Sequence, residues 1–139
     1  MTKNLIVTIS IGNRPWFRKT KKTINKYCNK YDIEFKVITG QYDTDKKIRL
    51  RKFDIVKYFE TYDRLLFLDD TLIINPNAPN LFNIVPFNKV GVLFEKEPYF
   101  NKIGILKNAL NYYNVRANIN NDNYIWFNSG VILASKCHT

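Results

Sequence analysis

The chain has 139 residues, a length that suits one domain with one hydrophobic core, and its net charge is +10. Apolar residues make up 45% of it and aromatic residues 15%, which excludes a disordered polar chain and collagen-like repeats. No run approaches about 18 apolar residues, so we expect no transmembrane helix. The excess of Lys and Arg indicates an anionic partner, which is a nucleotide, a nucleic acid or a membrane surface.

The two cysteines, Cys28 and Cys137, stand far apart and lack the spacing of a metal site. This argues against a disulfide framework and against zinc, and it fits a reducing compartment. We therefore expect a cytoplasmic location. Asn, Lys and Ile, which have AT-rich codons, are abundant, so we expect an AT-rich bacterial or viral source. For a virus the location would be the host cytoplasm.

The first half of the chain alternates between strand and helix patterns. Residues 4–11 form an apolar, β-branched run that predicts a buried strand, and turn residues 12–15 follow it. Residues 34–39 predict a second strand, and 41–45 form a polar loop. Between the two strands, one face of an amphipathic helix is marked by Ile24, Tyr27, Cys28 and Tyr31.

The second half continues the alternation. Residues 46–62 predict a helix, with Leu50, Phe53, Val56 or Lys57, and Phe59 or Glu60 recurring every three to four positions. Residues 64–68 are continuously apolar, which is typical of a strand covered on both faces. Further elements are a loop at 75–79, a strand at 90–94, a helix over 103–113, and one or two strands over 124–134 broken at 128–130. This order predicts a single α/β domain over 1–139, with a mostly parallel sheet and helices on both faces.

The sharpest chemical signal is Asp69-Asp70, directly after the buried run 64–68. Open α/β sheets bind ligands at the carboxyl ends of their strands. Two unpaired carboxylates there would be costly, and Mg²⁺ or Mn²⁺ would remove the cost by oxygen coordination. Strand-end Asp pairs also occur as caps and turns, so position alone leaves both interpretations open.

Two other groups allow more than one interpretation. Basic residues cluster over 14–30 and 46–57, and most fit a solvated helix face, while one or two could meet a diphosphate. A nucleic-acid surface would use the whole set, but no nucleic-acid motif is present. Asn128-Ser129-Gly130 interrupts an apolar run, either as a structural bulge or as a site where the Asn128 amide recognises hydroxyls.

Two segments resemble the nucleotide-sugar glycosyltransferases of the GT-A fold, most closely the family 8-like group. Residues 62–74, Tyr-Asp-Arg-Leu-Leu-Phe-Leu-Asp-Asp-Thr-Leu-Ile-Ile, are similar to the group's strand and D-x-D motif, and residues 76–82 to the segment that follows it. Residues 126–133, Trp-Phe-Asn-Ser-Gly-Val-Ile-Leu, are similar to the group's later N-S-G strand. Both motifs occur in the family's order, and the resemblance covers roughly residues 4–136.

The resemblance implies a Rossmann-like fold and transfer of a sugar from a nucleoside diphosphate, with a UDP-sugar as the expected donor, to a hydroxyl of a glycan or protein. It implies that Asp69 and Asp70 hold Mn²⁺ or Mg²⁺, with Asp69 also binding the nucleotide. The segment Ser10-Ile11-Gly12 would hold the base, and Arg49 and Lys52 would lie near the phosphates. Asn128, Ser129 and Gly130 would face the donor sugar.

The chain also departs from the family pattern. Thr71 stands where the second Asp of the motif is expected, and the chain ends just after the N-S-G strand, whereas family members continue into an acceptor-binding half. The chain is therefore expected to be either a truncated fold or a minimal protein that completes its site by self-association, and apolar surface exposed by a missing half would favour a homodimer. The alternatives are a non-catalytic nucleotide-sugar binder and a basic nucleic-acid-binding module.

Overall fold

The computed structural model describes residues 2–40, 48–94 and 127–139, with the backbone alone for 48–50. The chain divides into two compact units, Met1–Val92 with Ser129–Thr139, and Leu93–Asn128. Most described residues belong to the first unit. In the described ranges, no helix combines the length and apolar character needed to span a bilayer.

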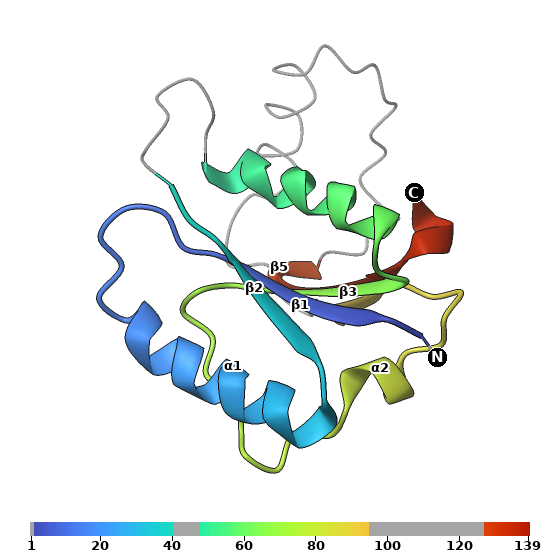
Figure 1. Ribbon diagram of the computed structural model, residues 1–139, viewed down its shortest axis with the longest axis horizontal. Coiled ribbons are helices and arrows are strands. Elements are labelled where there is room, and N and C mark those ends of the chain that lie inside the picture. Colours follow the sequence, from blue (N-terminus) through green and yellow to red (C-terminus); the bar gives the residue numbers. More distant parts are fainter. Residues whose placement is uncertain (1, 41–47, 95–126) are drawn as a thin grey trace. The chain divides into compact units, whose positions relative to one another are not determined.

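A five-stranded sheet forms the centre of the fold (Figure 1). Its strands are β1 (Asn4–Ile9), β2 (Glu34–Ile38), β3 (Arg64–Leu68), β4 (Gly91–Phe94) and β5 (Phe127–Ser135). Their order is β2-β1-β3-β5-β4. Strand β1 pairs parallel with β2 and β3, whereas β5 pairs antiparallel with β3. The predicted α/β fold is confirmed, and β5 makes the sheet mixed.

Helices cover both faces of this sheet. The covering helices are α1 (Phe17–Tyr31), η1 (Ile48–Glu60) and α2 (Leu81–Ile84). A short helix, η2 (Lys136–His138), follows β5, and η1 and η2 are 3₁₀ helices. Helices α1 and η1 lie on opposite sides of the sheet (Figure 1). Helix α1 ends because Asp32 adopts a left-handed conformation with φ 52°.

The core explains the continuous apolar runs of β1 and β3. Side chains alternate across a strand, so each strand buries one set on each face. Ile6 and Leu66 pack with Ile24 of α1, while Leu5 and Leu65 pack on the η1 side. All five residues of β3 are buried. This burial fixes the carboxyl ends of β1 and β3 side by side.

Two local expectations differ from the structure, and one short helix was not expected. Residues 128–130 do not break β5, because the Gly130 carbonyl accepts a hydrogen bond from the Asp69 N–H at 2.8 Å and keeps the strand paired. In η1, Phe59 is buried as predicted, but Ile55 and Tyr58 also pack toward the sheet and Phe53 is 71% exposed. The short helix α2 was not predicted, because four residues carry no periodicity. The predicted helix over 103–113 lies outside the described residues.

Candidate functional site

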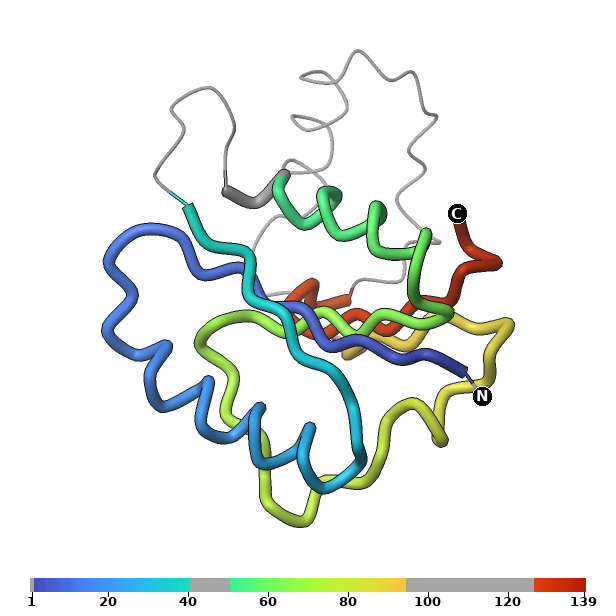
Figure 2. The backbone as a smooth tube through the Cα atoms, in the orientation of Figure 1, coloured from blue at the N-terminus to red at the C-terminus, as the bar shows by residue number. Residues whose placement is uncertain are grey.

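A cavity of about 380 Å³ opens where β1 and β3 end. Its lining residues are Ile9, Ile11, Arg14, Lys52, Phe67, Asp69, Asp70, Thr71 and Ser129. The chain leaves β1 and β3 at the same end of the sheet (Figure 2). In the order β2-β1-β3, the crossover connections diverge between β1 and β3, and such switch points are where open α/β sheets bind ligands. All lining residues belong to the first compact unit.

One wall of the cavity is apolar. Ile9, Ile11 and Phe67 form a buried cluster, against which Ile38, Ile55 and Ile132 pack. The cluster combines side chains from four strands with one from η1 and with Ile11 from the loop after β1, so this wall is anchored in the core. An apolar wall beside charged groups is the usual composition of a small-molecule site.

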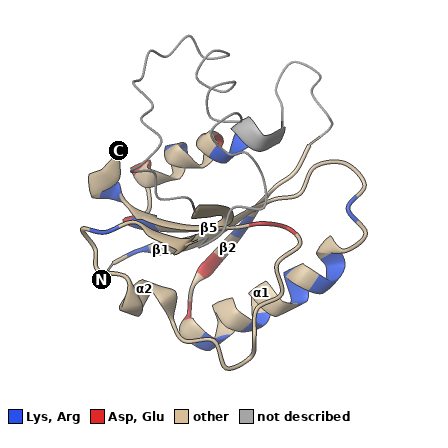
Figure 3. Ribbon diagram, turned by 180° about the vertical axis from the view of Figure 1, so that it is seen from behind, with Lys and Arg blue, Asp and Glu red and all other residues tan. Residues whose placement is uncertain are grey.

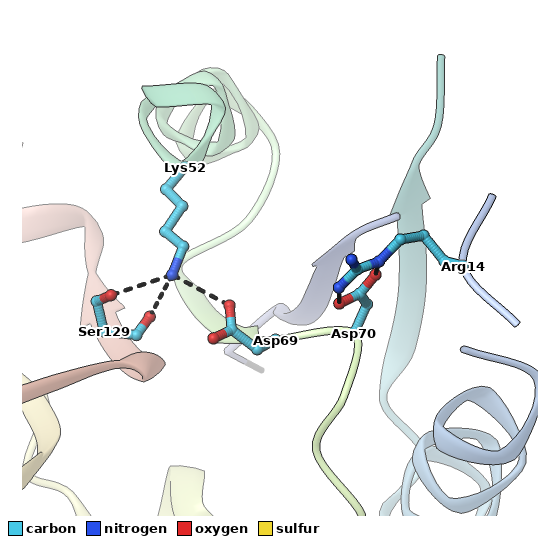
Figure 4. Close-up of polar contacts among 5 residues, drawn as sticks. All are labelled: Arg14, Lys52, Asp69, Asp70 and Ser129. Atoms are coloured by element: carbon cyan, nitrogen blue, oxygen red, sulfur yellow. Dashed lines mark hydrogen bonds and ion pairs between the residues drawn. The ribbon is translucent and has the colours of Figure 1, made fainter. Parts of the chain in front are cut away.

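Lys52 connects η1 to the ends of β3 and β5 across the cavity (Figure 4). Its ammonium lies 3.0 Å from Asp69 Oδ1 and donates to the Ser129 carbonyl at 2.9 Å and to Ser129 Oγ at 3.1 Å. It also lies 4.8 Å from the centre of the Phe67 ring. The Asp69 side chain is 41% exposed and the Lys52 side chain 23%. The pair is therefore accessible to a ligand that enters the cavity.

Asp70 makes a different contact. Arg14 Nε donates to Asp70 Oδ2 at 2.6 Å and Arg14 Nη2 donates to Oδ1 at 2.7 Å, a two-pronged pair that uses both carboxylate oxygens (Figure 4). Asp70 is buried, whereas the Arg14 side chain is 43% exposed. Gly12, with φ 76°, allows the loop after β1 to turn toward β3 and carry Arg14 there.

The two carboxylates of the cavity differ in how well they suit a divalent cation. Asp69 fits, because its carboxylate is exposed to the cavity and Mg²⁺ commonly uses one or two carboxylates together with substrate phosphates. Asp70 fits only after Arg14 releases it. In the described ranges, no cluster of three or more His, Cys, Asp or Glu could hold a metal. The lone histidine, His138, follows β5 at the opposite end of the sheet, since Ser135 pairs with Arg64.

The structure brings several predicted site residues together and leaves others apart. Ile11, Lys52, Asp69, Asp70 and Ser129 line the cavity. Of the other predicted residues, Ser10 is buried beside it, Gly12 shapes the loop and Gly130 pairs with β3. The Arg49 side chain lies outside the described part of the chain. Asn128 is exposed in β5 but belongs to the second compact unit.

Arg14 is the main site residue that the sequence analysis did not single out. It appeared only as one member of a basic cluster, although it lies in the turn 12–15 that follows a predicted strand. A cation in the loop after a buried strand sits at the ligand-binding edge of an α/β sheet. That position, rather than the charge density, was the available signal. Thr71, Ile9 and Phe67 were also missed as lining residues.

These features define an α/β sheet with a charged, half-apolar cavity at its carboxyl edge. No protein-family model and no curated protein matches the chain. Among solved structures, it is similar to the crystal structure of a glycosyltransferase involved in the glycosylation of the major capsid of PBCV-1. The TM-score is 0.58 and the sequence identity 15%, with 97% of this chain and 61% of that chain covered.

The chain therefore spans about three fifths of that structure's length and shares its fold. At this identity the likeness concerns the fold alone. It supports the glycosyltransferase fold expected from the sequence, but it does not distinguish the family 8-like group, which stays a prediction.

Proposed function

We propose that this chain forms the donor-binding part of a glycosyltransferase that moves a sugar from a nucleoside-diphosphate sugar to a hydroxyl acceptor. The observation that carries the proposal is the cavity at the ends of β1 and β3, which combines Asp69 and Asp70 with Arg14 and Lys52 in the fold of a glycosyltransferase. The expected donor is a UDP-sugar, and the acceptor is a glycan or protein hydroxyl.

The charge distribution suits a diphosphate. Among the residues that the structure describes, two cations line the cavity, Arg14 and Lys52, and both are partly exposed. Arg can bind phosphate oxygens in a two-pronged manner, while Lys acts as a point charge. The apolar wall of Ile9, Ile11 and Phe67 suits the flat face of a nucleobase. Ser129, and Asn128 by its sequence position, would bind sugar hydroxyls.

The chemistry requires stabilisation of a leaving group. The bond between the anomeric carbon and the diphosphate oxygen breaks, and its electron pair departs with the diphosphate. The acceptor oxygen bonds to the anomeric carbon, and its proton leaves to the diphosphate or to water. Arg14 and Lys52 would neutralise the charge that develops on the diphosphate, which lowers the barrier because they are positioned beforehand. Mn²⁺ or Mg²⁺ held by Asp69, and by Asp70 once Arg14 releases it, would supply Lewis-acid stabilisation of the same charge.

Calorimetric titration of UDP, with Mn²⁺ and with EDTA, tests the proposal. We expect binding in Mn²⁺ that weakens in EDTA. The Asp69→Asn variant should lose the metal-dependent part of UDP binding, because Asp69 is the carboxylate that is exposed to the cavity. Asp70→Asn should lose less of the metal-dependent binding, because Arg14 already occupies that carboxylate, and it should strengthen metal-free binding by a few-fold, because Arg14 is released toward the phosphates. Absence of UDP, GDP and CDP binding in both conditions would refute a nucleotide-sugar site.

Turnover separates the enzyme from a non-catalytic binder. Incubation with UDP-sugars should release UDP, whereas UDP binding without sugar transfer or hydrolysis would establish the binder instead.

A homodimer and a cytoplasmic location remain predictions. Light scattering over a range of protein concentrations checks the first.

A further inference from the structure

We propose that the exposed face of α1, together with the adjoining groove, is a docking surface for an anionic lipid membrane. Of the eight exposed positions in α1, six are cationic and two are Asn. The six cations are Arg18, Lys19, Lys21, Lys22, Lys26 and Lys30. Along this helix, Figure 3 shows Lys and Arg positions but no acidic ones.

Carboxylates of the described residues do not neutralise these charges. Among the residues that the structure describes, none of the six cations forms an ion pair with a carboxylate. Lys19 lies 5.0 Å from the centre of the Trp16 ring, and Lys30 donates to the Pro76 carbonyl at 3.3 Å. An accumulation of positive charge on one helix face attracts a negatively charged surface.

Apolar groups border the same face and indicate which anionic partner it fits. Trp16, just before α1, is 66% exposed. A mainly apolar groove of about 470 Å³ runs along the flank of α1, lined by Lys26 and Lys30 on one side and by Ile73, which is 60% exposed, on the other. Trp beside Lys and Arg is typical of surfaces that lie in the headgroup region of a bilayer.

A membrane explains these features better than a nucleic acid does. Cations alone would serve either partner, since both attract them electrostatically. Trp16 could serve either partner, because an indole can lie in lipid or stack on a base, but an exposed Ile and an apolar groove gain free energy in lipid and offer a base no stacking face. The surface is built from α1, Trp16 and Ile73, none of which lines the donor cavity, so the inference does not depend on the proposed function.

Vesicle co-sedimentation tests the surface. The probes are phosphatidylcholine vesicles with and without phosphatidylserine, at low and high salt. We expect the wild type to bind the anionic vesicles at low salt only. Changing Lys22, Lys26 and Lys30 to Gln should reduce binding about a hundredfold, since each charge near an anionic surface contributes about fivefold. Trp16→Ser with Ile73→Ser should also reduce binding, although the charge is unchanged.

A second triple variant, Lys57→Gln with Lys89→Gln and Lys136→Gln, is the matched control. These three lysines are exposed and lie outside α1, and replacing them removes the same charge. The control should keep vesicle binding within about threefold of the wild type. Equal losses in both triple variants, or no binding of anionic vesicles by the wild type, would overturn the proposal. So would tighter binding of duplex DNA than of vesicles that is lost in the α1 variant.

Discussion

Lys52 is the side chain that links three elements around the cavity. It contacts Asp69 and both oxygens of Ser129, so it holds η1 against the ends of β3 and β5. We expect Lys52→Met to weaken UDP binding roughly 10- to 100-fold, because a hydrogen bond to a charged group contributes about 1.5–3 kcal/mol. Calorimetry measures the loss.

Lys57→Met provides the control for that variant. Lys57 is exposed on the same helix and does not line the cavity. Its removal changes the net charge equally and should leave UDP affinity within about twofold of the wild type. If both variants bind UDP equally well, Lys52 is structural and not part of the donor site.

The two cysteines should differ in reactivity because their surroundings differ. Cys28 lies on the buried face of α1, and this burial raises the pKa of its thiol to about 11, whereas Cys137 is exposed. At pH 8 an alkylating reagent should label Cys137 in the folded protein and Cys28 only after unfolding, since the thiolate is the nucleophile. Mass spectrometry of the labelled peptides distinguishes the two sites.

The same shift predicts how stability changes with pH. The unfolded thiol loses its proton near its ordinary pKa, while the folded thiol retains it up to about 11. Between these values the unfolded state binds fewer protons, so the Cys28 contribution to the free energy of unfolding falls as pH rises. Urea denaturation of the wild type should show this fall, and Cys28→Ala should lack that part of it. Parallel pH profiles would contradict the shift.

At the scale of elements, Arg64 joins three segments that are distant in sequence. Its buried guanidinium donates to the Phe82 carbonyl of α2, to the Val85 carbonyl at 2.8 Å and to Ser135 Oγ of β5 at 3.0 Å. Burial lowers the pKa of this guanidinium, but its carbonyl and hydroxyl acceptors keep it solvated by the protein. The four-residue helix α2 therefore depends on a side chain from β3.

Replacing Arg64 by Met should destabilise the fold by about 2–4 kcal/mol, because two carbonyls and a hydroxyl lose a charged donor. Urea denaturation measures the change. Arg18→Met on the exposed face of α1 should change stability by no more than about 0.5 kcal/mol. A similar, small effect of both changes would mean that Arg64 does not anchor α2.

The elements with strong periodicity were predictable, and those held by distant contacts were not. Strands β1 and β3 and helix α1 follow from continuous apolar runs and from helical spacing, which are local properties of the sequence. Helix α2 depends on Arg64, and the inward face of η1 depends on Ile55 and Tyr58 meeting the sheet. Neither contact has a local signature.

The site residues were likewise predictable where their signal is local and unpredictable where it depends on a distant contact. Asp69 and Asp70 were found because they end a buried run, and Lys52 and Ser129 followed from resemblance. The pairing of Asp70 with Arg14 spans 56 positions of sequence and arises only when β1 and β3 lie side by side. Both carboxylates were predicted to hold one ion, whereas in the structure each pairs with a different cation, Asp69 with Lys52 and Asp70 with Arg14.

At the scale of the whole molecule, the net charge of +10 predicts a fold that salt stabilises. Like charges four positions apart on a helix cost about 0.2–0.5 kcal/mol per pair, and α1 contains several such pairs, among them Lys22 with Lys26 and Lys26 with Lys30. Salt screens this repulsion. Raising NaCl from low to moderate concentration should add about 1–2 kcal/mol, which corresponds to a rise in Tm of about 4–8 °C.

Thermal denaturation across a salt series measures this effect, and the two triple variants locate its origin. Replacing Lys22, Lys26 and Lys30 by Gln should raise Tm at low salt and flatten the salt dependence, because most of the like-charged pairs in α1 are removed. Replacing Lys57, Lys89 and Lys136 removes the same net charge from positions outside α1 and should preserve most of the slope. Identical slopes would place the repulsion in the total charge of the protein rather than in the α1 face, and a Tm that falls with salt would contradict both explanations.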